Sequence, residues 1–173
     1  MQATRIWQRA KSPLKDCSSF MARGDSNIEV GETGDGLWVA GAAGRGRIAQ
    51  LSGTVVRIDV EGHAYVEFAE AMTPLMDQLL NTWGRLYLAI DAEGMASYDA
   101  RFRYLWTEWI KRNETALDGI VILFRSRVVQ SVAVIINAVT GGDLVEACDD
   151  REAFEERLAA AVIGSPRAVS VVS

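Results

Sequence analysis

A stripe of apolar side chains at helical spacing, followed at once by a short apolar run, constrains the fold of this chain more than any other feature. The stripe repeats at i, i+3, i+4, i+7, i+8 and i+11, and consists of Met72, Leu75, Met76, Leu79, Leu80 and Trp83. Thr73 and Pro74 suit the first turn of such a helix, and Gly84 suits its end. The run Leu86–Ile90 is typical of a strand buried on both faces. A helix that leads into a buried strand predicts an α/β fold with a mostly parallel sheet.

The same alternation continues toward the C-terminus. A second stripe at helical spacing runs from Phe102 to Ile110, with Asp99 as its expected N-cap, and residues 120–124 form a further short apolar run. Residues 127–139 are apolar nearly all round and rich in β-branched side chains, and their length and the Gly-Gly pair that follows them predict a helix. A last strand over 144–148 is expected to lead into a last helix.

The N-terminal half has the pattern of strands. Glycines punctuate short apolar patches between Gly24 and Gly53, which is typical of short strands joined by tight turns. Residues 54–59 and 64–68 both alternate at the period of a strand, so that the segment between them predicts a β-hairpin turn with His63 as a solvated turn residue. The predicted element order is ββαβαβαβα after a glycine-rich strand region.

Length and composition indicate a single domain with two flanking segments. Hydrophobic residues make up 49% and charged residues 24% of the 173 positions, which is enough to bury a core without metal or disulfide. Residues 1–24 carry five basic side chains against one acidic, and we expect a flexible basic arm there, a domain over 25–163 and a flexible tail over 164–173. The net charge of −5 leaves the chain after this arm acidic, which argues against a nucleic-acid partner.

The sequence also predicts a location. Polar residues interrupt the longest apolar run before it reaches the roughly 20 residues that a membrane-spanning helix needs. Charged residues break up positions 1–20, where a secretory signal would be continuously apolar. The two cysteines, Cys17 and Cys148, are too far apart in sequence to indicate a metal site or a redox pair, and they suit a reducing compartment. We therefore expect a cytoplasmic protein without a transmembrane segment.

The segment from Leu86 to Ala100, LYLAIDAEGMASYDA, resembles the strand, loop and helix start of STAS domains, especially their SpoIIAA-like branch. The resemblance covers about residues 54–163 and implies a single STAS-like domain, related to anti-sigma-factor antagonists and to CRAL-TRIO lipid-binding domains. In the antagonists, a serine that a partner kinase phosphorylates follows the aspartate at the helix start. Asp99 matches that aspartate, whereas Ala100 occupies the serine position. The resemblance therefore implies a protein-docking module without the phosphoserine switch.

Two sets of residues are candidate binding sites. The docking surface implied by the resemblance lies in the loop and the helix start, at Asp91, Glu93, Ser97, Tyr98, Asp99 and Arg101, where Ser97 and Tyr98 are also alternative modification sites. The helix predicted over 127–139 is either a wholly buried core helix or one covered by a second subunit, a lipid or a membrane interface. Its apolar interface positions are Val128, Val132, Ile135, Ile136 and Val139.

The chain shows no pattern of catalytic chemistry. His63 is its one histidine, nothing in the sequence places a nucleophile beside it, and no metal-ligand spacing or cofactor motif occurs. We therefore predict a non-catalytic module, without a cofactor, that docks a protein partner in a bacterial signalling or regulatory pathway. The alternative is a small domain that binds a lipid or another apolar ligand or associates with a membrane. An enzyme of unknown type is a third hypothesis, which rests only on the carboxylates Asp91, Glu93 and Asp99. A homo-oligomer is compatible with the first two hypotheses.

Overall fold

The computed structural model describes residues 28–125, 134–138, 142 and 144–164. In chain order its elements are β1 (Glu29–Thr33), β2 (Gly36–Gly41), β3 (Gly44–Gln50), β4 (Val55–Ala64), α1 (Val66–Trp83), β5 (Leu86–Ala92), β6 (Met95–Tyr98), α2 (Ala100–Asn113), the 3₁₀ turn η3 (Glu114–Ala116), β7 (Leu117–Phe124), β8 (Val145–Cys148) and α4 (Arg151–Gly164). Residues 134–138 are also helical and lie between β7 and β8 in the chain.

The strands form one mixed sheet, so that the prediction of a mostly parallel sheet is not confirmed. The sheet order is β1-β2-β3-β4-β5-β7-β8, and β6 pairs with the end of β4. The pairs β1 with β2, β2 with β3 and β3 with β4 are antiparallel, whereas the pairs of β4 with β5, β5 with β7 and β7 with β8 are parallel. Short turns join β1 to β4, and only antiparallel strands can be joined so directly. The longer connections that contain α1 and α2 return the chain to the same end of the sheet, so that β4, β5 and β7 run parallel.

The predicted hairpin over 54–68 is wrong, because β4 runs straight through its expected turn. His63 is a strand residue, and Gly62, with a φ of 69°, adjoins an irregularity in the pairing of β4 with β6. The segment 64–68 contains the end of β4 and the start of α1. Phe68 is one of the buried residues of α1. The apolar pattern over 64–68 therefore fits the spacing of a helix as well as that of a strand. Pro74 consequently lies inside α1, whereas Gly84 ends the helix as predicted.

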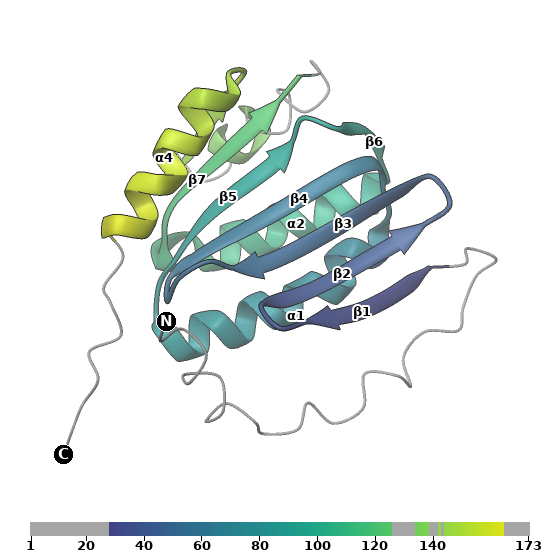
Figure 1. The fold of residues 1–173 in the computed structure, drawn as a ribbon, viewed down its shortest axis with the longest axis horizontal. Coiled ribbons are helices and arrows are strands. Elements are labelled where there is room, and N and C mark those ends of the chain that lie inside the picture. Colours follow the sequence, from purple (N-terminus) through teal and green to yellow (C-terminus); the bar gives the residue numbers. More distant parts are fainter. Residues whose placement is uncertain (1–27, 126–133, 139–141, 143, 165–173) are drawn as a thin grey trace.

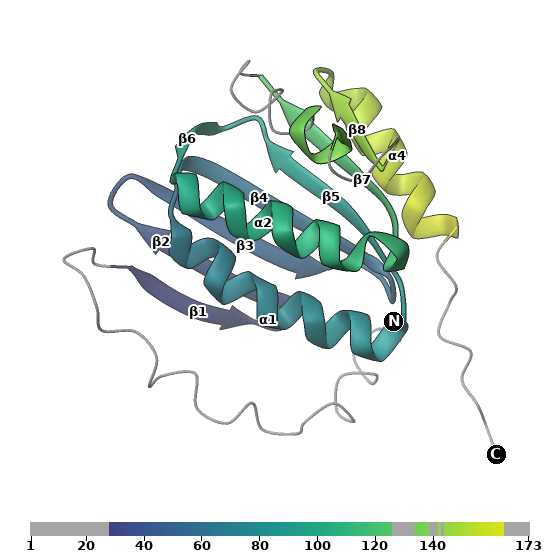
Figure 2. The same cartoon turned by 180° about the vertical axis from the view of Figure 1, so that it is seen from behind.

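Two helices cover one face of the sheet and a third covers part of the other. Helices α1 and α2 lie side by side across the same face, and α4 packs on the opposite face near β7 (Figures 1 and 2). In α2 the indole Nε1 of Trp109 donates a hydrogen bond of 2.7 Å to Asp77 of α1, which joins the two helices. Trp106 and Trp109 are buried in the core, as the helical stripe predicted.

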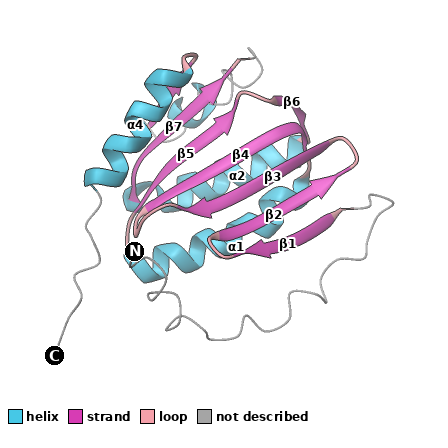
Figure 3. Cartoon of the chain, viewed as in Figure 1, coloured by secondary structure: helices cyan, strands magenta, loops and turns pink. Residues whose placement is uncertain are grey.

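The face of β1–β4 opposite α1 and α2 carries no helix among the described elements (Figure 3). Within the described residues, no helix is both long enough and apolar enough to cross a bilayer.

Candidate functional site

An apolar pocket lies on the helix-covered side of the sheet, between the central strands, α1 and α2. Its volume is about 60 Å³. Its described lining residues are Ile58, Val60, Met72, Ile90, Ala92, Met95, Tyr98, Phe102, Arg103, Trp106, Ile110, Ile122 and Ile136. At roughly 10–15 Å³ for each water-sized group, the pocket holds about four to six such groups. Because protein cores are normally packed without voids of this size, this one is a candidate ligand site.

Local sequence explains why these side chains meet. Ile58 and Val60 of β4 and Ile90 and Ala92 of β5 alternate along their strands, so that each pair points to the same face of the sheet. From α2, Phe102, Arg103, Trp106 and Ile110 follow at helical spacing and face this surface of the sheet. The pocket is therefore formed by residues that the amphipathic patterns identify only as core.

Ile136 reaches the pocket from the helical residues 134–138, which a side-chain clamp joins to β8. The Asn137 amide donates to the backbone carbonyl oxygen of Val145 at 2.8 Å, and its Oδ1 accepts the backbone N–H of Val145 at 2.9 Å. Of the predicted apolar interface residues, Ile136 is 2% exposed and lines the pocket, and Ile135 is half-buried. Val128, Val132 and Val139 lie outside the described residues.

Trp106 and Arg103 contribute only apolar atoms to the pocket wall, and their side-chain polar groups have no partner within the described part of the chain. Trp106 is 7% exposed, and its indole Nε1 has no hydrogen-bond acceptor there. Arg103, one turn before it on α2, is half-buried and forms no ion pair with any described residue. A buried donor without an acceptor costs about 1–3 kcal/mol of stability, so such groups are rare in folded proteins. The helical stripe in the sequence is compatible with Trp106 either in the core or in the wall of an apolar pocket, whereas no pattern in the sequence identifies Arg103.

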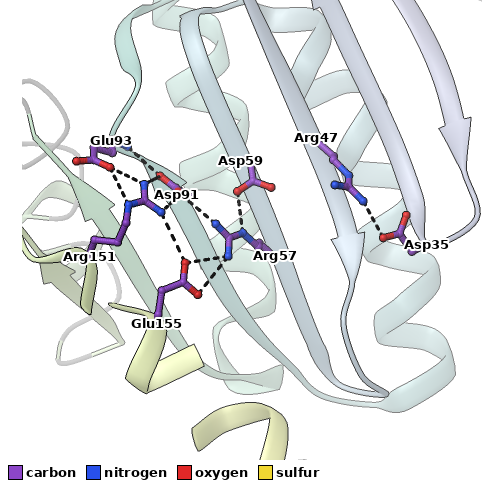
Figure 4. Close-up of polar contacts among 8 residues, drawn as sticks. All are labelled: Asp35, Arg47, Arg57, Asp59, Asp91, Glu93, Arg151 and Glu155. Carbon is purple, nitrogen blue, oxygen red and sulfur yellow. Dashed lines mark hydrogen bonds and ion pairs between the residues drawn. The ribbon is translucent and has the colours of Figure 1, made fainter. Parts of the chain in front are cut away.

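The predicted docking residues Asp91 and Glu93 lie instead in a network of charges on the other side of the sheet (Figure 4). The Asp91 carboxylate, 13% exposed, contacts the guanidinium of Arg57 at 3.1 Å and that of Arg151 at 3.0 Å. Glu93 contacts Arg151 at 2.5 Å and Arg125 at 3.2 Å. The hydrogen bonds from Arg151 to these two carboxylates raise the pKa of its guanidinium. This network joins β4, β5 and the start of α4, and its acidic groups are already neutralised.

The remaining members of the network come from elements far apart in sequence. Arg57 also contacts Asp59 at 2.8 Å and Glu155 of α4 at 3.1 Å, and a separate pair joins Arg47 of β3 to Asp35 in the β1–β2 turn at 2.8 Å (Figure 4). Arginines opposite carboxylates on a partly buried surface are a frequent structural device, because each partner compensates the desolvation of the other.

A second polar cluster joins His63, Ser97 and Asp99. The His63 ring contacts Ser97 Oγ through Nδ1 at 2.7 Å and Asp99 Oδ1 through Nε2 at 3.1 Å. Because a carboxylate only accepts hydrogen bonds, Nε2 donates to Asp99, and Nδ1 shares a hydrogen bond with the Ser97 hydroxyl. Tyr65 packs edge-on against the same ring at 4.8 Å. His63 is thus a half-buried strand residue, and the interpretation of a solvated turn histidine is wrong.

Asp99 occupies the N-cap position of α2, as predicted, but its side chain serves another helix. Its carboxylate makes no capping hydrogen bond to α2. Instead Oδ2 accepts the backbone N–H of Val66, the first residue of α1, at 2.9 Å. The N-cap of α1 is Tyr65, whose side chain makes no capping bond, so Asp99 supplies the missing acceptor from a distant part of the chain.

The contacts among Ser97, His63 and Asp99 follow the order of nucleophile, base and carboxylate found in acyl-transfer enzymes. Acyl transfer also needs a substrate groove and donors for the oxyanion. Ser97 is exposed and is not among the residues that line the pocket. The three residues join β4, β6 and the beginnings of α1 and α2, and this structural role is sufficient to explain their contacts.

The last predicted docking residues, Tyr98 and Arg101, lie on either side of the α2 start. Tyr98 lines the pocket, whereas the Arg101 side chain is 72% exposed and lies 3.7 Å from Glu70 of α1. Tyr104, one turn further along α2, is 61% exposed. The structure thus distributes the predicted docking set among a charge network, the His63 cluster, the pocket and this exposed part of α2.

Comparisons with known proteins show the fold. No family model matches the sequence, and no curated protein matches it. A crystal structure of a DUF3478 family protein with a SpoIIAA-like fold, from Shewanella loihica PV-4, is similar to this chain with a TM-score of 0.51 at 14% identity. The match covers 80% of this chain and 98% of the other. The chain therefore has a SpoIIAA-like fold, and the resemblance found in the sequence is confirmed at the level of fold.

Proposed function

We propose that this chain is a non-catalytic binding module that holds a small apolar ligand in the pocket between the sheet and α2. The observation that carries this proposal is a pocket of about 60 Å³ whose described walls are made almost entirely of aliphatic, methionine and aromatic side chains. Apolar cavities of this kind favour hydrocarbon over water, because water finds no hydrogen-bond partners in them. Ile136 connects the pocket with the segment whose apolar surface suggested such a ligand.

The pocket volume sets the expected affinity. Transfer of a methylene group from water into an apolar site contributes about 0.8 kcal/mol, which is close to fourfold in affinity. Four to six such groups contribute roughly 3–5 kcal/mol, so a short-chain ligand is expected to bind with a dissociation constant of about 1 mM. A ligand with a longer hydrocarbon chain gains less affinity for each added methylene group once the pocket is filled, unless it extends beyond the described walls.

A series of straight-chain primary alcohols from butanol to decanol tests the proposal. We expect affinity, measured by chemical-shift titration, to rise about fourfold per methylene and then level off. The Ala92→Leu variant fills part of the pocket and is expected to weaken hexanol binding at least fourfold. Ala96→Leu, at an exposed position of β6 outside the pocket, is the matched control. Binding that is equal in both variants, or absent for every alcohol, would refute the proposal.

Protein docking is the second candidate function, supported by the exposed start of α2. Arg101 and Tyr104 lie one turn apart there, and arginine and tyrosine are among the residues most enriched in binding hot spots. With Ala100 beside them in place of a modifiable serine, such docking needs no phosphoserine switch. In this proposal the chain acts in the cytoplasm, in a bacterial signalling or regulatory pathway, with a protein partner or a second copy of itself.

Photo-crosslinking in the native host tests this second function. A photoreactive residue at position 104 is expected to capture one defined protein, whereas the same residue at the exposed position Glu152 on α4 is not. An Arg101→Glu substitution should reduce the first crosslink at least tenfold. If crosslinking is equally diffuse at both positions, the start of α2 is not a docking surface.

A further inference from the structure

Strand β1 lies at one end of the sheet, and no described strand pairs with its outer edge. At the opposite end, the Asn137 side chain binds both backbone groups of Val145 in β8, at 2.8 and 2.9 Å. Among the described residues, no side chain closes the edge of β1 in this way. An uncovered strand edge carries unpaired N–H and C=O groups, which are a template for a further strand.

The direction of these groups follows from the hydrogen bonds of the neighbouring strands. The Gln50 N–H donates to the Asp35 carbonyl oxygen at 2.8 Å, which fixes the alternation of hydrogen bonds along β2. By this alternation Gly31 bonds inward to β2, whereas Val30 and Glu32 direct their N–H and C=O groups outward. The side chain of Val30 is also 44% exposed, so that both its backbone and its side chain are open to a partner.

The charges at this edge are acidic and uncompensated within the described part of the chain. Glu29 and Glu32 are both exposed, and neither forms an ion pair with a described residue. The arginines of β3, Arg45 and Arg47, are paired with other carboxylates. Like charges on neighbouring strands repel, so a second copy that paired through β1 would bring glutamates together. A basic segment therefore fits the edge better than a second copy of this chain.

Trp38 of β2 extends toward this edge on the face of the sheet that carries no described helix (Figure 3). Its neighbour Val39 is buried in the core with α1, so Trp38 faces the other way. A Cβ on Gly31 would lie 2.6 Å from the Trp38 indole, which places the ring over the glycine backbone of β1. The half-buried ring is not part of the apolar core on either side of the sheet. An arginine or lysine of an added strand gains a cation–π contact there.

We propose that the outer edge of β1 binds a basic segment of a partner protein, which adds to the sheet as an extended strand. The backbone of this segment pairs with the outward groups of Val30 and Glu32, as in other complexes that form by strand addition. Its basic side chains lie opposite Glu29 and Glu32, and one of them contacts the Trp38 ring. This surface is separate from the pocket and from the start of α2, so that the inference goes beyond both candidate functions.

A synthetic peptide, acetyl-TKRVKT-amide, titrated into the whole chain tests the inference. In antiparallel register it places lysines opposite Glu32 and Glu29, and its arginine lies opposite Gly31. We expect saturable shifts of the β1 amides and of the Trp38 indole N–H. Exchange of the Val30 and Glu32 amides with solvent should slow about tenfold on saturation, because strand addition engages them. The Gly31 amide, which is already bonded to β2, should change little.

Two altered peptides separate strand addition from attraction between charges. A peptide with glutamate in place of its lysines and arginine should bind about tenfold more weakly, because like charges then face each other. A peptide with proline in place of its valine keeps the charges but lacks one backbone donor. We expect this peptide not to slow the exchange of the outward amides.

Variants of the chain provide the matched control. The double substitution Glu29→Gln and Glu32→Gln should weaken binding of the basic peptide about fivefold. The substitutions Glu152→Gln and Glu156→Gln remove the same charge from exposed positions of α4 and should leave binding unchanged. Val30→Pro removes one outward N–H that β2 does not use, and proline is tolerated on edge strands, so this variant is expected to fold and to lose the peptide.

Two results would overturn the inference. If the Val30 and Glu32 amides already exchange slowly without peptide, another part of the chain or a second copy covers the edge, and the dependence on protein concentration distinguishes these two occupants. If the basic peptide binds equally to both pairs of glutamine variants, or leaves the outward amides unprotected, only general electrostatic attraction holds it. The alcohol titration of the pocket and the crosslink at position 104 are independent of these results, so a failure here leaves both candidate functions unaffected.

Discussion

Removal of the Asp99 carboxylate tests how the α1 and α2 helices are held against the sheet. Asp99 Oδ2 caps the first N–H of α1 at 2.9 Å, and Oδ1 binds His63 at 3.1 Å. Loss of a helix cap typically costs about 1 kcal/mol, and loss of a charge-assisted hydrogen bond at a half-exposed site costs about 1 kcal/mol more. We therefore expect Asp99→Ala to lower the free energy of unfolding by about 2 kcal/mol, or Tm by roughly 4–8 °C.

Urea unfolding followed by tryptophan fluorescence provides the measurement. Asp99→Asn retains an acceptor oxygen for the Val66 N–H and should lose only about half as much stability as Asp99→Ala. Asp118→Ala, which removes an exposed carboxylate paired with Arg85, should change stability by no more than about 0.5 kcal/mol. A His63→Ala substitution in each background should give a coupling energy above 0.5 kcal/mol if the contact stabilises the fold.

Two results would contradict this reasoning. A loss below about 0.5 kcal/mol in Asp99→Ala would mean that water replaces both contacts without cost. Equal losses of stability in Asp99→Ala and Asp99→Asn would mean that the charge of Asp99, and not its hydrogen bond to the Val66 N–H, stabilises the fold. The expected loss also bears on docking experiments, because an Asp99 variant can lose a partner through displacement of α1. Arg101 and Tyr104 are therefore the more specific probes of the α2 surface.

Further predictions concern the backbone, the thiol and the serine. Gly62→Ala should cost more than 2 kcal/mol in urea unfolding, because φ is 69° and a Cβ would lie 2.2 Å from a carbonyl oxygen, whereas Gly84→Ala, with φ 75° and open space, should cost about 1 kcal/mol. Burial raises the pKa of the Cys148 thiol, so in a Cys17→Ser variant iodoacetamide at pH 8 should react at least tenfold more slowly with the folded than with the unfolded chain. A fluorophosphonate probe should leave Ser97 unlabelled in intact-mass analysis, and labelling there would contradict a non-catalytic module.

Sequence patterns predicted the part of the fold in which periodicity is unambiguous. The α2 stripe and the β5 run correspond to helix and strand as expected, because each pattern extends over several residues with one period. The predicted boundary between β4 and α1 is wrong, because residues 64–68 fit the period of a helix as well as that of a strand. Strand β6, with four residues, was interpreted as loop because it is too short to show a period and depends on pairing with β4. Its parallel partner is more than 30 positions away, which no local pattern reveals.

The candidate site was less accessible to sequence reasoning for a related reason. The carboxylates at the end of β5 were identified, but their partners Arg57 and Arg151 come from β4 and α4, and only the tertiary fold brings them together. The pocket depends on the gap that remains between packed side chains, and the pattern that identifies core residues does not show whether the core is full.

The contacts that the polar groups of the predicted docking loop already make favour the pocket over this loop as the ligand site. A ligand gains little from a carboxylate that already has arginine partners, because it must replace contacts of similar strength. Asp91 and Glu93 are held in this way, and Asp99 is bound by His63 and α1. The pocket is in the opposite condition, since its wall is apolar and a ligand that enters it displaces no polar contact of the fold. Binding in the pocket therefore gains apolar burial without the loss of an existing ion pair, and an apolar ligand is expected there before a polar ligand on the loop.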